Sequence, residues 1–223
     1  MSTMLTAARR LVGFIAMVLL VTGGTLALAQ PVQAHSRSGV GVIPGSAFLQ
    51  PRDLGGAVPQ QLTDEYAAHL RPPLPGGAER YRSQASRQAQ GAIVIDYPTA
   101  DFHTTLIEYV ATYRGTGAAR YLRELRRALP RCGGRTDEVG RWTVVRTDLA
   151  GPGSLLIRLR ERWEYPDGQP LTHATYAIVA RVGHAVVVLA DVGWEYASGQ
   201  RVTVQPLINP ALRRAATLRR GEV

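Results

Sequence analysis

Three arginines stand at alternate positions of one apolar segment, and their spacing points directly to binding chemistry. They are Arg158, Arg160 and Arg162. Because residues two apart in a β-strand share a face, these side chains are expected on one face of a strand, about 7 Å apart. Guanidinium groups bind carboxylate and phosphate through paired hydrogen bonds. The spacing therefore predicts a surface for an anionic ligand. The alternative is a solvated face on which Glu108 or Glu164 neutralises the arginines.

Large aromatic residues gather at the ends of two predicted strands. The tripeptide Trp-Glu-Tyr occurs twice, at 163–165 and at 194–196. At the mouth of a sheet, Trp163, Tyr165 and Trp194 would line a ligand pocket, and we include them with the three arginines as candidate ligand-binding residues. The alternative role for these rings is packing within the core.

Motifs of catalysis and metal binding are absent from the sequence. There is no Gly-x-Ser-x-Gly elbow, no His-Glu-x-x-His, no Cys-x-x-Cys and no phosphate-binding loop. No two histidines have the spacing of metal ligands, although His103 and His173 fall in predicted strands and could meet in the fold. We therefore expect no catalytic residue, no metal site and no cofactor. The alternative is a hydrolase whose active site follows no such motif, for example one that uses Cys132 with a distant histidine.

The elements that must position these residues form a predicted α+β domain. Apolar residues recur every three or four positions over 118–129, which indicates a helix that Pro130 ends. A second helix is expected to start at Asn209 and Pro210. Short turns separate the later strands, so we expect antiparallel neighbours in a sheet of about five to six strands, with the helices packed on one face. Strands are predicted over residues 81–88, 92–96, 102–113, 141–147, 154–165, 171–182 and 184–194.

The first 34 residues have the three-part layout of a secretory signal peptide. Arg9 and Arg10 precede an apolar run, and small residues at positions 32 and 34 mark a cut before His35. The alternative is a membrane anchor, and both the general and the twin-arginine export routes are compatible with the arginine pair. Because no cysteine lies near the cut, we expect a secreted protein without a lipoprotein anchor and without a membrane span after cleavage.

Composition divides the rest of the chain into a lead segment and one domain. Residues 35–78 are rich in Pro and Gly and are expected to be flexible or irregular, and residues 79–223 form the domain. The formal net charge is +9, and every basic residue is Arg. Acidic residues are interspersed with the arginines, so no nucleic-acid partner is predicted. With Cys132 as the single cysteine, an internal disulfide is excluded, and no signal for an oligomeric state is present.

Three segments resemble a known family. Residues 47–56 are similar to the opening segment of small exported proteins of high-G+C Gram-positive bacteria, residues 118–132 to their central helix ending in Cys, and residues 181–189 to a later Val-rich strand. Together they resemble the PknH-type extracellular sensor domain and its stand-alone secreted relatives. The resemblance implies a sheet flanked by helices with a central cleft, a ligand-sensing role and no catalytic residues. Fuller members carry paired cysteines, whereas Cys132 has no partner in this chain.

These observations predict a secreted, non-catalytic ligand-binding or sensor-like protein of the cell envelope, with a small or anionic envelope ligand. Two alternatives stay open. One is a secreted hydrolase with an active site that the motifs do not show. The other is an envelope-interaction protein that uses its arginine-rich sheet face on an anionic polymer.

Overall fold

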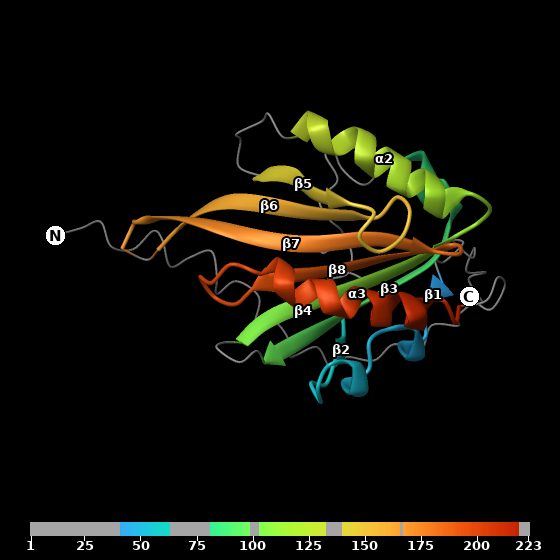
Figure 1. The fold of residues 1–223 in the computed structure, drawn as a ribbon, viewed down its shortest axis with the longest axis horizontal. Helices are drawn as coiled ribbons and strands as arrows, with labels where there is room; N and C mark the ends of the chain where they lie inside the picture. The colour runs from blue at the N-terminus through green and yellow to red at the C-terminus, as the bar shows by residue number, and fades with distance from the viewer. Residues whose placement is uncertain (1–40, 63–80, 99–102, 133–139, 166, 219–223) are drawn as a thin grey trace, which may run out of the picture. The chain divides into compact units, whose positions relative to one another are not determined.

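The computed structural model describes residues 41–62, 81–98, 103–132, 140–165 and 167–218, all of them within one compact unit, Gly39–Val223 (Figure 1). For the last two residues of the central helix, Arg131 and Cys132, only the backbone is described. The predicted signal peptide, residues 1–34, lies outside the described residues.

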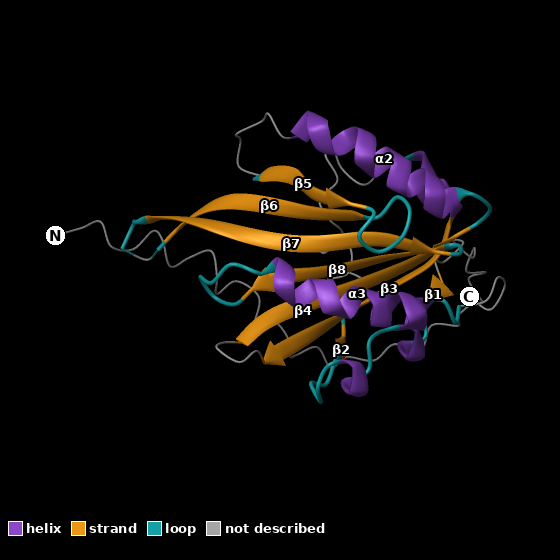
Figure 2. Cartoon of the chain, in the orientation of Figure 1, coloured by secondary structure: helices purple, strands orange, loops and turns teal. Residues whose placement is uncertain are grey.

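A largely antiparallel sheet of eight strands forms the centre of this unit (Figures 1 and 2). The strands lie in the order β1-β3-β4-β8-β7-β6-β5, and β2 also pairs with β3. Among the described pairs, only β1 with β3 is parallel. The strands are β1 Gly41–Val42, β2 Gln60–Gln61, β3 Arg87–Pro98, β4 His103–Tyr113, β5 Arg141–Thr147, β6 Leu155–Glu164, β7 Pro170–Val182 and β8 Ala185–Gly193. The predicted α+β class is confirmed, and the six longer strands correspond to the predicted five to six.

The last four strands form where the alternation of residues predicts them. β5 has the predicted bounds, and the bounds of β6, β7 and β8 differ from the prediction by one residue at each end at most. All three connections join antiparallel neighbours. Between β7 and β8 the chain reverses through Gly183, whose φ of 55° lies in the left-handed region that glycine adopts without steric cost.

The beginning of the sheet differs from the prediction. Most of the residues expected as a first strand, 81–88, form a short 3-10 helix, η4 (Arg82–Ser86). The last two, Arg87 and Gln88, begin the continuous twelve-residue strand β3, to which the expected run 92–96 also belongs. Ser83 in η4 is buried, and its hydroxyl donates to the Glu124 carboxylate at 2.6 Å. This contact ties η4 to the central helix, a long-range interaction that overrides the local strand pattern.

In the described part of the chain, two α-helices pack against the sheet, from opposite faces rather than from the one face expected. They are α2 (Gly117–Cys132) and α3 (Arg201–Ala215). Along β8, Val186 and Val188 pack in the cluster that contains the apolar residues of α2, whereas Val187 and Leu189 pack in the cluster of α3. Since successive strand residues point to opposite faces, one helix covers each face. We call these the α2 face and the α3 face. The physical reason is that β8 is apolar on both faces, so both need a cover.

The closing helix begins much earlier than predicted. α3 starts at Arg201, and Pro206 and Pro210 lie inside it, so Asn209 is not its N-cap. The buried positions of α3 recur every three or four residues, which outweighs the two backbone donors that the prolines remove. Those positions are Thr203, Val204, Leu207, Ile208, Ala211 and Ala215. α2 similarly continues for two residues past Pro130, which was expected to end it.

Residues 41–62 are part of the domain and not a lead outside it. Ile43, Phe48, Leu49 and Leu54 are each at most 1% exposed and pack in the cluster under α3. Gly91 on β3 makes room for one of these side chains, since a Cβ there would stand 3.1 Å from Cζ of Phe48. The boundary expected at residue 79 is therefore not a boundary of the core.

Candidate functional site

A row of arginines lies on the α3 face, beyond the part of the sheet that α3 covers. On β6, Leu156 packs in the cluster under α3, and Arg158, Arg160 and Arg162 follow on the same face because they are two residues apart. On β5, Arg141 stands directly opposite Arg160 in the register of the two strands. Arg158 is half-buried, and the other three are exposed. We call these four arginines the basic face.

None of the described ion pairs joins a carboxylate to the basic face. The ion pairs described there join His103 to Asp96, Arg126 to Asp148 and Arg214 to Asp53, and none includes an arginine of the basic face. The buried Nε of Arg158 has no hydrogen-bond partner.

Neither acid considered as a neutralising partner has that role in the described residues. Glu108 is buried on β4, where its Oε2 accepts a hydrogen bond from the Leu49 N–H at 2.8 Å. Glu164 is exposed on β6 and forms none of the described ion pairs. Neither acid therefore forms an ion pair with the arginine row among the described residues.

A depression of about 320 Å³ borders the basic face at the start of α3. Its floor is Tyr176 and Ala174 of β7, which pair directly with Arg158 and Arg160. Its wall is the segment from Ser198 to Val202, including the exposed Arg201. The depression lies beside the start of α3, whereas the resemblance implied a central cleft; the centre of this face is filled by the apolar cluster under α3.

A buried carboxylate holds the wall of this depression in place. Asp191 is fully buried at the end of β8, and its Oδ1 accepts hydrogen bonds from the Thr104 hydroxyl and, at 2.9 Å, from the Gly193 N–H. Its Oδ2 accepts one from the Gln200 N–H at 2.9 Å. The Ser198 hydroxyl also accepts from the Ala174 N–H at 2.9 Å. These contacts fix the loop before α3 against the sheet. Asp191 was assigned no role from the sequence, where its partner Thr104 is 87 positions away.

The six candidate ligand-binding residues do not form a single site. Trp163 is on β6 between Arg162 and Glu164, so it points to the α2 face, opposite to the arginines. There it stacks on His173 of β7, with ring centroids 4.0 Å apart and 4° between the planes. Tyr165, just after β6, contacts Tyr196 with ring centroids 4.9 Å apart. Four of the aromatic side chains are exposed and are not core residues: Trp163, Tyr165, Tyr196 and Trp194.

A second buried carboxyl, Glu108, lies beneath the segment that precedes β2. Burial raises the pKa of Glu108 to about 8, with a smaller increase from the charge of Asp53 and decreases from the Leu49 N–H and from Arg214. Its Oε1 is buried without a hydrogen-bond partner. The carboxyl is therefore protonated at neutral pH. It faces the packed segment and lines no described depression.

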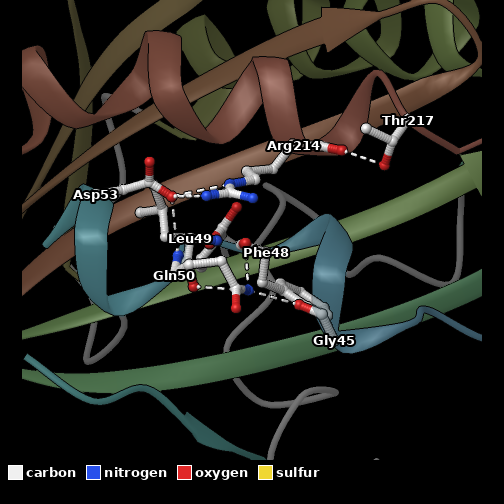
Figure 3. A network of polar contacts seen from close by, with 8 residues as sticks. Gly45, Phe48, Leu49, Gln50, Asp53, Arg214 and Thr217 are labelled. Atoms are coloured by element: carbon white, nitrogen blue, oxygen red, sulfur yellow. Dashed lines mark hydrogen bonds and ion pairs between the residues drawn. The ribbon is translucent and has the colours of Figure 1, made fainter.

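Near Glu108, an ion pair fastens the same segment to α3 (Figure 3). Arg214 donates from Nε to Oδ2 of Asp53 at 2.8 Å. Burial would raise the pKa of Asp53, but hydrogen bonds from the Gln50 N–H and Arg214 and the charge of Arg214 together lower it below its ordinary value. Sequence analysis missed this pair, whose members are 161 positions apart.

The described residues contain no group of three or more His, Cys, Asp or Glu side chains that could hold a metal ion. His103 on β4 contacts Asp96, and His173 lies on β7 with β8 between the two strands, so these histidines do not meet. The side chain of Cys132, the alternative nucleophile, lies outside what the structure describes. None of the described helices is both long and apolar enough to cross a membrane. The sequence matches no protein-family model and no curated protein.

Proposed function

We propose that this chain is a secreted, non-catalytic binding protein of the cell envelope whose basic face holds a polyanionic ligand. The observation that carries the proposal is the basic face itself. Arg141, Arg158, Arg160 and Arg162 share one surface of the sheet, and none forms an ion pair among the described residues. Export rests on the predicted signal peptide, and the resemblance to PknH-type sensor domains is consistent with a role in ligand sensing.

The energetics of the basic face favour a ligand. Arg141 and Arg160 stand directly opposite each other on neighbouring strands, an arrangement of like charges that costs a few tenths of a kcal/mol up to about 1 kcal/mol. Salt screens this repulsion in the free protein, and a bound anion reverses it. Repulsion within the basic face therefore lowers the free energy of unfolding, and a bound anionic ligand would offset this loss.

The geometry favours an extended ligand with repeated charges. Alternate residues of β6 place the three guanidinium groups in a line about 13 Å long from Arg158 to Arg162. Each guanidinium can bind a phosphate or carboxylate group through two hydrogen bonds. A single small anion would engage only part of this row, whereas a polymer that runs along β6 would engage all of it. The depression beside Tyr176 would receive a group that branches from such a polymer.

The test compares two triple variants that change the net charge equally. Binding of the protein to long-chain inorganic polyphosphate and to polygalacturonate is measured by isothermal titration calorimetry, so that phosphate and carboxylate ligands are distinguished. The variant Arg158→Gln, Arg160→Gln, Arg162→Gln is expected to weaken binding about tenfold or more, because each charge-assisted hydrogen bond contributes about 1.5–3 kcal/mol.

The matched control removes three exposed arginines from α2. Arg120, Arg123 and Arg127 are exposed and form none of the described ion pairs. Their replacement by Gln is expected to change the affinity by about twofold or less, through long-range attraction alone. Equal losses in the two triple variants would show that net charge and not the basic face determines binding. The proposal is also contradicted if the unaltered protein binds neither polymer.

A further inference from the structure

Exposed aromatic residues at the end of β6 have a chemistry different from that of the basic face. They belong to two ring pairs, which are Trp163 with His173 on the α2 face, and Tyr165, just after β6, with Tyr196. Trp163, Tyr165 and Tyr196 are 38%, 37% and 42% exposed, whereas His173 is only 2% exposed. We call these four residues the aromatic platform. Large aromatic side chains exposed together on one surface mark a binding site more often than isolated ones do.

The stacking fixes the orientation of the Trp163 ring. Its plane is parallel to the buried His173 ring within 4°, at a centroid distance of 4.0 Å. One face of the indole therefore covers the imidazole, and the exposed area of Trp163 comes from the opposite face and the edges. Because His173 cannot move without disturbing β7, the indole is held in place before any ligand arrives. A preorganised ring loses little conformational entropy on binding.

Two polar side chains lie next to the Trp163 ring. Glu161 lies on the same face of β6, two residues before Trp163, and stands directly opposite His173 in the register. Burial raises the pKa of the Glu161 carboxyl, and the charge of His173 partly opposes this rise. The Nδ1 of His173 is buried without a hydrogen-bond partner. Hydrogen-bonding groups thus lie beside and beneath an open aromatic surface.

We propose that the aromatic platform binds a pyranose ring of a neutral polysaccharide. The C–H groups on one side of a pyranose carry partial positive charge and pack on the electron-rich face of an aromatic ring. Its hydroxyl groups lie around the edge of the sugar, where the Glu161 carboxyl, on the same face of β6 as Trp163, can form hydrogen bonds with them. The arginines of β6 lie on the opposite face of the sheet, so the two surfaces of β6 select different chemical groups.

The test measures binding to neutral hexasaccharides with β-1,4-glucose, β-1,3-glucose, β-1,4-N-acetylglucosamine and β-1,4-mannose linkages. Titration calorimetry gives the affinities. Trp163→Ala is expected to weaken binding to the best of these sugars tenfold or more, and Trp163→Phe, which keeps an aromatic face, is expected to recover most of it. Because Trp163→Ala uncovers His173, circular dichroism must show that the variant is folded, and Tyr196→Ala, with an expected loss of threefold or more, tests the platform without uncovering His173.

Two control variants show whether sugar binding belongs to the aromatic platform. Trp194→Ala removes an exposed tryptophan for which no ring partner is described and is expected to change the affinity less than twofold. The triple variant of Arg158, Arg160 and Arg162 is expected to leave sugar binding unchanged, so failure of one proposal is distinguishable from failure of the other. The proposal is overturned if no hexasaccharide binds the unaltered protein, or if Trp194→Ala weakens binding as much as Trp163→Ala.

Discussion

Replacing Glu108 by Gln tests whether a neutral carboxyl is buried beneath the segment before β2. The folded protein holds this carboxyl at a pKa of about 8, against an ordinary value of 4.5 in the unfolded chain. Between these two values the folded state binds one proton more than the unfolded state does. The free energy of unfolding therefore falls as the pH rises from about 4.5 towards 8, and the contribution is level outside this interval.

The size of this effect follows from the two pKa values. Each pH unit within the interval changes the free energy of unfolding by about 1.4 kcal/mol. Glu108 thus lowers the stability by somewhat less than about 1 kcal/mol at pH 5 and by about 3 kcal/mol at pH 7. Gln has nearly the same shape, and its carbonyl can accept the hydrogen bond from Leu49. Since Gln does not titrate, the Glu108→Gln variant escapes this loss.

The assay is urea denaturation of both proteins at pH 5, 6, 7 and 8, followed by fluorescence of the buried Trp142 and the other tryptophans. The stability of Glu108→Gln relative to the unaltered protein is expected to increase by about 2–3 kcal/mol from pH 5 to pH 7. Val144→Ala, which changes an exposed side chain that cannot titrate, is the control and should give a difference independent of pH over this range. A difference for Glu108→Gln that does not change with pH would show that Glu108 is not buried as a neutral carboxyl.

Three further substitutions test other parts of the structure by the same denaturation assay. Asp191→Asn replaces an accepting oxygen with an amide that faces a backbone donor, so a loss of about 1–3 kcal/mol is expected, and an unchanged stability would contradict the described contacts. Leu125→Ala, at a fully buried position of α2, should cost about 2–5 kcal/mol, and a cost below about 1 kcal/mol would mean that α2 does not pack as described. Arg214→Gln should lower stability by about 1–3 kcal/mol at pH 7. The pKa of Asp53 is lowered in the folded protein, so the stability that its carboxylate contributes disappears as the carboxyl protonates at low pH. The difference in free energy of unfolding between Arg214→Gln and the unaltered protein should therefore shrink below about pH 4. A difference that stays constant down to about pH 2 would show that the ion pair is not its cause.

Local periodicity in the sequence was enough to place the residues of β6 on their two faces. The alternation that puts Arg158 and Arg160 on one face puts Trp163 on the other, and the structure has this arrangement. The same alternation shows that the arginines and Trp163 cannot share a pocket in the sheet, although they were grouped as one candidate site. The error lay in treating closeness along the strand as closeness on one surface.

Features that depend on distant parts of the chain could not be predicted. Leu49 meets Glu108 across 59 positions of sequence, and Thr104 meets Asp191 across 87. No local pattern indicates such pairs. Val204 and Ile208 have the four-residue spacing of a helix, which indicates the early start of α3. Pro206 and Pro210 lie in the same segment and argued against a helix there. Tertiary packing, which favours a helix there, outweighs the local cost of two prolines.

Binding of a polyanion to the basic face would protect its individual arginines from chemical modification. Because the chain has no lysine, phenylglyoxal labelling read by mass spectrometry reports on all its basic side chains. Labelling is measured with saturating polyphosphate and with saturating polygalacturonate. We expect at least one of the two polymers to slow the labelling of Arg141, Arg160 and Arg162 at least fivefold. Labelling of Arg123 and Arg127 on α2 should stay within twofold of its rate without polymer. Protection spread evenly over all exposed arginines, or concentrated on α2, would contradict the account.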